Sequence, residues 1–394
     1  FDATNSWIFQ TIGRLHPMLR TALLPRELLR KRNTRIRIRI GGKVTPQRLA
    51  RIADDRDAAA YLRARTYLLS DRVRVSRAIK AGEPIAPESD RDAINREVQA
   101  LPPERTLASS KDLRVIIAHS SEIPTTLAEI GRLREITFRQ VGEGTGLSTD
   151  IDRFDQTYRH LFVYNDSARE IVGAYRLGIT DELQDAAGIP DLYTATLFAY
   201  SAEQLRRLTP GIELGRSFVR PEYQRQFAPL LLLWQGIGHY AAANPRHRYV
   251  FGTASISDTY PSLSKKLLVR FVTDAFGPGE FADVAQPTTP PRFDRHRNRE
   301  ADIASTLLSN LEDADELVSA IDPHNRGIPI LLRQYLRLGA KMIGFNVDAA
   351  FGNALDGLIV VDLLTGPSRQ IAKYMGDEGY KSFCEYHKQR GTVG

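Results

Sequence analysis

The stretch from Glu213 to Tyr223 constrains the fold of this chain more than any other. It reads Glu213-Leu-Gly-Arg216-Ser-Phe-Val219, then Arg220 and Pro221, and an apolar run follows over residues 228–243. Proline cannot donate to a sheet ladder, so we expect a strand that ends before Pro221. The length of the apolar run predicts a helix. A strand that leads into a helix is typical of a sheet flanked by helices.

The same change between strand and helix patterns extends over residues 113–275. Short β-branched and aromatic runs predict strands at 113–118, 160–164, 171–177 and 249–253. Helical patterns lie at 122–141, 228–243 and 260–271. The turn signal Asn165-Asp166 makes the second and third strands antiparallel neighbours. Further towards the C-terminus we expect a helix over 328–338 and strands at 343–347 and 358–363.

Composition narrows the class of protein. The chain has 394 residues, 42% of them hydrophobic and 26% charged, which is typical of a soluble globular protein with more than one unit. No apolar run is long enough to cross a bilayer. The single cysteine, Cys384, excludes an internal disulfide framework and suits a reducing compartment. The net charge of +7 favours an acidic partner, which leaves nucleic acid, an anionic membrane and an acidic carrier protein open.

The sequence lacks the motifs of several kinds of catalytic and binding site. The histidines show no metal-ligand spacing, so we expect no metal. There is no nucleophile elbow and no phosphate-binding Walker loop. Only the overall charge supports nucleic-acid binding, because no basic patch is interleaved with aromatic residues. We therefore expect no nucleic-acid partner.

Two groups of charged residues remain as candidates for a site. Glu213 and Arg216 stand three residues apart near the end of a strand, where a carboxylate can take a proton from an amine. The alternative is an ion pair between them that only fixes the strand end. The aspartates Asp150, Asp152 and Asp155 can hold a cationic group, or they can belong to an ordinary turn or helix start.

These residues carry a resemblance to a known family. Residues 113–275 resemble the GNAT-like N-acyltransferases that make ornithine lipids and related acyl-amino-acid lipids, a group often called hemolysin-like. The resemblance rests on Leu133-Arg134-Glu-Ile-Thr-Phe138, on residues 150–155, on Val172-Gly173-Ala-Tyr-Arg176-Leu177 and on residues 213–223. Acyl-homoserine-lactone synthases, which use S-adenosylmethionine, are also similar. The run from Tyr335 to Leu363 looks like an extension found on the lipid-forming group, which favours that branch.

The resemblance implies a fold and a set of roles. We expect a mixed, mostly antiparallel sheet flanked by helices, of α/β class, with a C-terminal α/β extension. Glu213 is expected to be the general base, with Arg216 beside it in the catalytic site. The aspartates 150, 152 and 155 are expected to hold the amine of an amino-acid acceptor, ornithine first. Arg134 and Arg176 are expected to bind its carboxylate, or to act as buried partners of the same aspartates.

The acyl donor is also inferred from this comparison. Acetyl-CoA-using GNAT enzymes place a glycine-rich loop at a helix N-terminus, whereas residues 220–229 here contain no glycine. We therefore expect no bound cofactor and an acyl carrier protein, with its 4'-phosphopantetheine thioester, as donor. Its docking surface is expected to include Arg220, Arg225, Lys265 and Lys266. The alternative is a basic surface that simply faces solvent.

The first 45 residues resemble the end of a glycerolipid O-acyltransferase domain. The similar residues are Asn5-Ser6-Trp-Ile-Phe9, Leu15-His16-Pro17 and 19–29, but the chain has no His-x4-Asp signature for O-acylation. We divide the chain into this remnant at 1–45, a helical connector at 46–107, the GNAT-like core at 108–275 and the extension at 276–394.

Location is inferred from the basic segments and from the family. A strand is expected over residues 35–40, with arginines on one face, and it is either a half-buried edge strand or a surface that contacts anionic lipid. The basic residues 292–299 are a second candidate for contact with anionic lipid. We expect a cytoplasmic protein at the inner face of the bacterial membrane. The remaining alternative is a non-catalytic, membrane-associated remnant of a two-domain protein.

Overall fold

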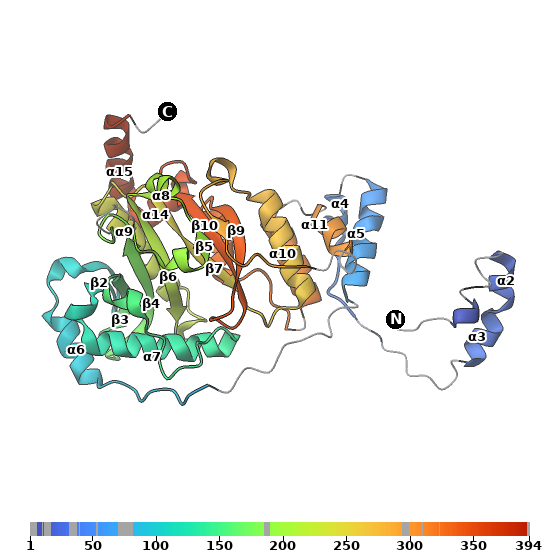
Figure 1. Ribbon diagram of the computed structural model, residues 1–394, viewed down its shortest axis with the longest axis horizontal. Coiled ribbons are helices and arrows are strands. Elements are labelled where there is room, and N and C mark those ends of the chain that lie inside the picture. Colours follow the sequence, from blue (N-terminus) through green and yellow to red (C-terminus); the bar gives the residue numbers. More distant parts are fainter. Residues whose placement is uncertain are drawn as a thin grey trace.

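A single mixed sheet forms the centre of the protein (Figure 1). The computed structural model describes residues 6–9, 11, 17–30, 38, 40–52, 54–69, 82–184, 190–293, 299–306, 308, 310–322 and 324–391. The sheet has eight strands in the order β1-β2-β3-β4-β6-β7-β10-β9. Their bounds are Thr106–Ser110, Leu113–His119, Arg159–Asn165, Glu170–Ile179, Gly211–Val219, Tyr249–Ile256, Ala354–Asp362 and Lys341–Asp348. Neighbouring strands are antiparallel, except that β6 and β7 are parallel.

The central strands are buried on both faces. Nine of the ten residues of β4 and all nine of β10 are buried, as their runs of Ile, Val and Leu predict. The hairpin between β3 and β4 turns at Asn165, whose side chain accepts hydrogen bonds from the backbone N–H groups of Ser167 and Ala168. This local bond is the reason that asparagine favours turns. The predicted hairpin is therefore confirmed.

Helix α7 (Pro124–Val141) covers one face of the sheet, together with α6 (Arg91–Ala100). A proline in its first turn starts α7, and Gly142 ends it with φ of +79°. The helix buries Ile130, Leu133 and Phe138 in a core shared with β2, β3 and β4. We call this side of the sheet the α7 face.

The opposite face is covered by α9 (Ala228–Ala243), and we call it the α9 face. The helices α14 (Ser368–Met375) and α15 (Asp377–Gln389) pack against α9. The Trp234 ring lies 5.0 Å from Tyr335 and 5.6 Å from Tyr374. Tyr335 comes from α13 (Ile330–Arg337), which contacts β7. Helix α10 (Ser262–Ala275) contacts β9 at the edge of the sheet.

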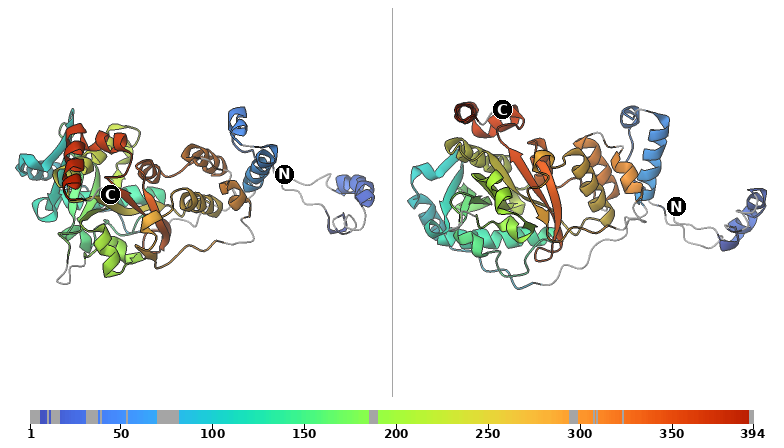
Figure 2. Two further views of the ribbon diagram at one scale, coloured as in Figure 1. Left: turned by 90° about the horizontal axis from the view of Figure 1, so that it is seen from above. Right: turned by 45° about the horizontal axis from the view of Figure 1, so that its top comes forward.

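Two helices between residues 46 and 68 pack against the C-terminal third of the chain (Figure 2). Helices α4 (Pro46–Ala50) and α5 (Asp55–Leu68) lie beside α11 (Arg299–Thr306) and α12 (Leu311–Ile321). Arg48 and Asp313 form an ion pair at 2.8 Å with side chains only 2% exposed. The segment predicted as a connector thus contributes buried side chains to the main core.

The remaining elements are short. They are α2 (Pro17–Ala22), α3 (Leu24–Arg30), α8 (Ala202–Leu208), and the small sheet of β5 (Phe198–Ala199) with β8 (Gln286–Pro287). The 3-10 helices are Pro103–Arg105, Ser120–Glu122, Arg153–Gln156, Tyr193–Thr196, Pro221–Tyr223 and Gly279–Phe281. The predicted fold class is confirmed. The strand expected over residues 35–40 lies mostly outside the described residues, as does most of the basic segment 292–299.

Candidate active site

Strand β6 carries a bulge at Arg216. Two residues of β6 lie between Gly215 and Phe218, whereas only one residue of β4 lies between their partners. Arg216 is in this bulge and has φ of +51°. Side chains alternate along a regular strand, so Glu213 and Arg216 would otherwise point to opposite faces. The extra residue brings both to the α7 face, where each bonds to Tyr193. Glu213 and Arg216, three residues apart on one strand, therefore share a face of the sheet only because of the bulge.

The two parallel strands separate just beyond Glu213. Within these fully described strands the ladder has four pairs and ends where Leu214 faces Gly252. Beyond this point β6 still pairs with β4 and β7 with β10, so the facing edges of β6 and β7 keep free backbone groups. Gly252 has φ of +157°, and a Cβ there would lie 2.1 Å from the carbonyl oxygen of Leu214. Glycine is thus required where the strands part.

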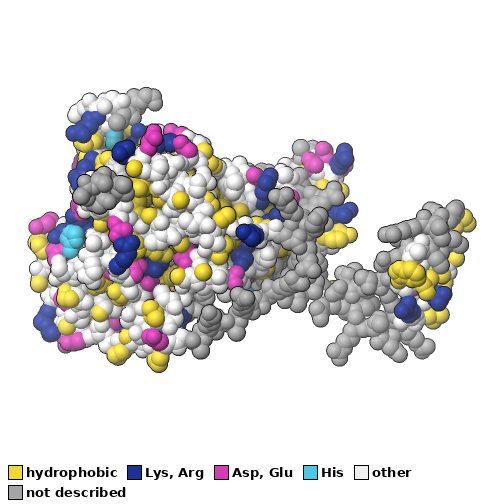
Figure 3. Space-filling view, viewed as in Figure 1, with side chains coloured by type: hydrophobic (Ala, Val, Ile, Leu, Met, Phe, Trp, Pro, Cys, Tyr) yellow, Lys and Arg dark blue, Asp and Glu magenta, His cyan; other side chains and the backbone are white. Residues whose placement is uncertain are grey.

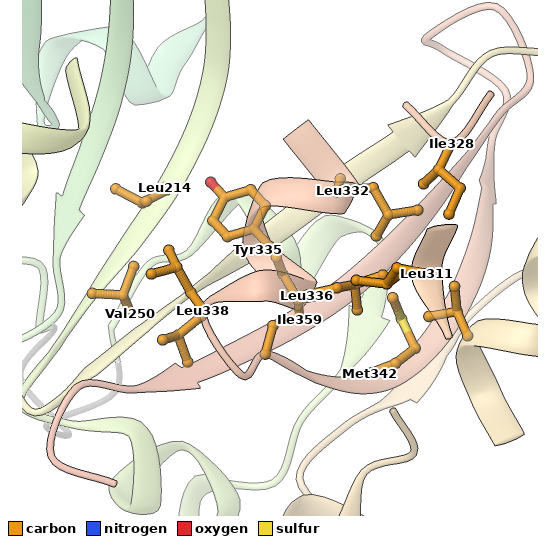
Figure 4. Close-up of a cluster of buried hydrophobic side chains, with 14 of the residues drawn as sticks. Leu214, Val250, Leu311, Ile328, Leu332, Tyr335, Leu336, Leu338, Met342 and Ile359 are labelled. Carbon is orange, nitrogen blue, oxygen red and sulfur yellow. The ribbon is translucent and has the colours of Figure 1, made fainter. Parts of the chain in front are cut away.

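Helix α13 lies behind this separation on the α9 face. Tyr335 is buried, and its ring points from α13 towards Leu214 of β6 (Figure 4). Val250 and Leu338 pack in the same cluster. The α9 face of the separation is therefore apolar, whereas its α7 face is polar, as the residues described next show.

Six of the predicted residues form one buried group on the α7 face, which we call the arginine–aspartate cluster. Arg134 pairs with Asp155 at 2.7 Å, and Arg176 pairs with Asp152 at 2.5 Å and with Asp155 at 3.3 Å. Arg216 lies 3.1 Å from Asp150 and 3.5 Å from Asp152. Three guanidinium and three carboxylate groups balance in charge, as buried ionic groups require.

The burial of the arginine–aspartate cluster limits which of the predicted roles its arginines can have. The side chains of Arg134 and Asp155 are 0% exposed, and that of Arg176 is 1% exposed. Burial alone would raise the pKa of Asp155, but Arg134 and Arg176 hold the pKa of this carboxyl well below its ordinary value. A substrate carboxylate would reach the two arginines only by displacing aspartates. The geometry thus favours the alternative interpretation, in which they are buried partners of the aspartates, and direct substrate contact stays a prediction.

Glu213 is held by three hydrogen bonds. Its carboxylate accepts from the Tyr158 hydroxyl, from the backbone N–H of Tyr193 at 3.1 Å and from that of Thr194 at 2.7 Å. Burial raises the pKa of Glu213, and these donors oppose the shift. Glu213 therefore fixes the start of the 3-10 helix Tyr193–Thr196. The alternative, an ion pair between Glu213 and Arg216, is not formed, because Arg216 pairs with Asp150 and Asp152 instead. The predicted role of Glu213 as general base stays a prediction.

Arg216 connects the cluster to the separated strands. Its guanidinium lies 4.9 Å from the ring centre of Tyr193 and 4.8 Å from that of Phe351. It also donates to the Tyr193 hydroxyl at 3.2 Å, and that hydroxyl donates to Asp348 at 3.2 Å. Arg216 is thus enclosed by aromatic rings, which strengthens its electrostatic interactions by excluding water.

A second set of carboxyl groups lies beyond Arg216, and none of its members was among the predicted site residues. We call Glu143, Asp348 and Asp356 the second carboxyl cluster; all three are buried. Burial raises the pKa of Glu143 to about 7, although Ser255 donates a hydrogen bond to it at 2.8 Å. Burial, then Asp348 and Glu143, raise the pKa of Asp356 well above its ordinary value. The available signal was an aspartate inside the apolar run of residues 354–361.

The raised pKa of Glu143 predicts a pH-dependent stability. The unfolded chain loses this proton near 4.5 and the folded chain near 7, so stability falls as pH rises between these values. We expect Glu143→Gln to match the wild type at pH 4 and to exceed its free energy of unfolding by about 1–3 kcal/mol at pH 8. Urea unfolding at both pH values measures this. Glu203→Gln, at an exposed position on α8, is the control; a difference that is equal at both pH values would contradict the assignment.

Three of the four residues predicted to dock the carrier protein form ion pairs within the chain. Arg220 pairs with Glu170 at 2.8 Å, Lys266 pairs with Asp302 at 2.8 Å, and Lys265 pairs with Asp258. Arg225 is exposed just before α9. On the face shown in Figure 3, basic and acidic side chains are interspersed, so no single basic field marks a docking surface there. The docking prediction now rests mainly on Arg225.

The fold and site define an acyltransferase of the GNAT class. Residues 133–235 match the family described as acetyltransferase (GNAT) domain. Among similar proteins, a glycine N(alpha)-acyltransferase of Phocaeicola vulgatus is 33% identical over 276 residues, which are 65% of this chain and 81% of that protein. One of Bacteroides thetaiotaomicron is 34% identical over 63% of this chain and 77% of its own length. An L-ornithine N(alpha)-acyltransferase of Brucella abortus is 30% identical over 70% and 97%.

This chain belongs to the family of amino-acid N(alpha)-acyltransferases. No solved structure was found to match it. In the part of the chain that is described, no helix is both long and apolar enough to cross a membrane. The same part holds no group of three or more histidine, cysteine or acidic side chains placed to bind a metal ion.

Proposed function

We propose that this protein transfers a (3-hydroxy)acyl chain from acyl carrier protein to the α-amino group of an amino acid, with ornithine as the preferred acceptor. The observation that carries the proposal is the separation of β6 and β7 beside the bulge at Arg216. A bulged residue leaves a backbone N–H unpaired, and such a group can stabilise the oxygen of a thioester carbonyl as negative charge develops. The facing strand edges offer hydrogen bonds to an extended pantetheine arm.

The second carboxyl cluster supports a cationic acceptor. Arg216 is the cation that acts on Asp356 of this cluster, and its charge is already balanced by Asp150 and Asp152. An acceptor ammonium group would supply the missing positive charge. Glycine is the second candidate acceptor, because two of the relatives are described as glycine N(alpha)-acyltransferases.

A direct assay tests the donor and the acceptor together. The purified chain is incubated with one 3-hydroxyacyl group attached either to acyl carrier protein or to coenzyme A, with ornithine, glycine, lysine or glutamine. Mass spectrometry identifies the amide, and thiol release gives the rate. We expect the carrier-protein thioester and ornithine to give the highest kcat/KM. Equal rates with coenzyme A would contradict the donor, a preference for glycine would contradict the acceptor, and release of methylthioadenosine from S-adenosylmethionine would support a lactone synthase.

Arg225 is proposed to dock the acidic carrier protein. It is exposed near the start of α9, and Phe227 beside it is 72% exposed. We expect Arg225→Glu to raise KM for the acyl carrier protein about tenfold with little change in kcat, because a charge on an interface mainly affects encounter. Steady-state kinetics at low and high salt measure this.

The matched control for this prediction is Arg63→Glu. Arg63 is an exposed residue of α5, which lies away from α9 in every view (Figures 1 and 2). The control is expected to keep the wild-type KM. An unchanged KM in Arg225→Glu at low salt would place the docking surface elsewhere.

Two further elements of the account stay predictions. The first 45 residues are proposed to be the end of a glycerolipid O-acyltransferase domain, on the resemblance described above. Peripheral binding to an anionic membrane is proposed because the product would carry a long acyl chain. Co-sedimentation of the purified chain with anionic and neutral vesicles tests this binding, and equal recovery with both kinds would contradict it.

A further inference from the structure

Asp356 is a buried carboxyl group without a partner. It lies near the start of β10, opposite Ser255 of β7 and Asn346 of β9, and it is 4% exposed. In the described part of the chain, no hydrogen bond or ion pair reaches its carboxyl oxygens. A buried carboxylate usually has a cation or several donors. The absence of both indicates that the partner is a molecule the protein binds.

The surroundings of Asp356 show what charge that partner carries. The groups that face it are Glu143 after α7, Asp348 at the end of β9, Arg216 of β6, the Tyr193 hydroxyl, and the neutral side chains of Ser255 and Asn346. Arg216 is the single cation among them, and it already faces Asp150 and Asp152. When these carboxyl groups are ionised the surplus is negative, which suits an ammonium group and excludes a carboxylate as the partner.

Asp356 and Glu213 differ in their freedom to accept a proton. The carboxylate of Glu213 already accepts three hydrogen bonds. Two of them come from backbone N–H groups, which can donate a hydrogen bond but cannot accept one. A proton on Glu213 would compete with one of these donors. Both oxygens of Asp356 are free, and Asp356 lies near the bulged residue Arg216, where the strands part.

We infer that Asp356, with Glu143 beside it, receives the proton that the acceptor ammonium must lose before it attacks the thioester. This inference rests on the proposed function and names its general base. The proton moves from nitrogen to Asp356, and the neutral amine then forms the C–N bond with the carbonyl carbon. The C–S bond breaks as the tetrahedral intermediate collapses. The second proton leaves the nitrogen and neutralises the departing thiolate, so that amide and thiol are the products.

Asp356→Asn tests this role through the pH dependence of kcat/KM. With the carboxyl group gone, only amino acid that is already deprotonated in solution can react. At pH 7 we expect a loss of about 100-fold or more. The loss should shrink by about tenfold for each pH unit towards the pKa of the amino acid. A purely structural role would lower the rate by the same factor at every pH.

Two further variants keep the test decisive. Asp356→Glu retains a carboxyl group and is expected to keep more activity than Asp356→Asn, with a wild-type pH profile. Asp362→Asn, at the far end of β10, removes the ion pair with Arg248 and is expected to lower stability without changing the profile. Wild-type activity in Asp356→Asn, or a loss independent of pH, would overturn the inference. A wild-type protein that acylates no amino acid would instead overturn the proposed function.

Discussion

Replacing Asp155 with asparagine is expected to lower the free energy of unfolding by about 3–5 kcal/mol. The substitution keeps the size of the side chain and leaves Arg134 and Arg176 with one carboxylate fewer. Both guanidinium groups are almost completely buried, so water cannot replace the lost charge. Urea unfolding at neutral pH measures the change.

An exposed pair provides the control for this prediction. Asp191 pairs with Arg153 at 2.5 Å, but the side chains are 54% and 63% exposed. We expect Asp191→Asn to cost less than about 1 kcal/mol. The pKa of Asp155 is lowered in the folded protein, so its contribution is present above the ordinary pKa and is lost as pH falls. The two variants should therefore converge in stability in acid; equal costs at neutral pH would contradict the role given to burial.

Replacing Arg216 with methionine is expected to lower kcat/KM by about 100-fold or more, because misplaced reacting groups cost this much. Arg216 pairs with Asp150, donates to the Tyr193 hydroxyl and lies against the Phe351 ring. Lysine keeps the charge, but a single ammonium cannot reproduce the planar fork that reaches Asp150, Asp152 and Tyr193 together. We therefore expect Arg216→Lys to lie between the wild type and Arg216→Met.

Loss of folding must be separated from loss of catalysis in this series. Arg248→Met is the matched control, because Arg248 pairs with Asp362 at the other end of β10, away from the bulge. It is expected to lower the melting temperature but to keep kcat/KM. Wild-type kcat/KM in Arg216→Met would exclude Arg216 from the site.

Much of the fold followed from local patterns. The strands β2, β3, β4, β7, β9 and β10 and the helices α7 and α9 lie where apolar runs and turn signals predict them. The division of residues 299–321 into two helices, α11 and α12, did not follow from these patterns. Long-range packing was not predictable either, because the burial of Tyr61 and Leu68 of α5 depends on helices more than 200 residues away.

Fewer features of the candidate active site than of the fold could be predicted from local sequence patterns. Glu213, Arg216 and the aspartates stood out because they are close together in sequence. Glu143, Asp348 and Asp356 are scattered over more than 200 residues, and only the pairing of β7, β9 and β10 brings them together. The bulge at Arg216 was also hidden, since a positive φ at arginine has no local signal.

The most direct test of the account is the identity of the product in cells. The chain and its Arg216→Met variant are expressed at equal levels in a host without amino-acid lipids, and lipid extracts are compared by mass spectrometry. We predict a new lipid in which a 3-hydroxyacyl chain is joined by an amide bond to an amino acid, present with the wild type and absent with the variant. Extracts that contain no N-acylated amino acid, although the wild-type protein is folded and abundant, would contradict the central claim.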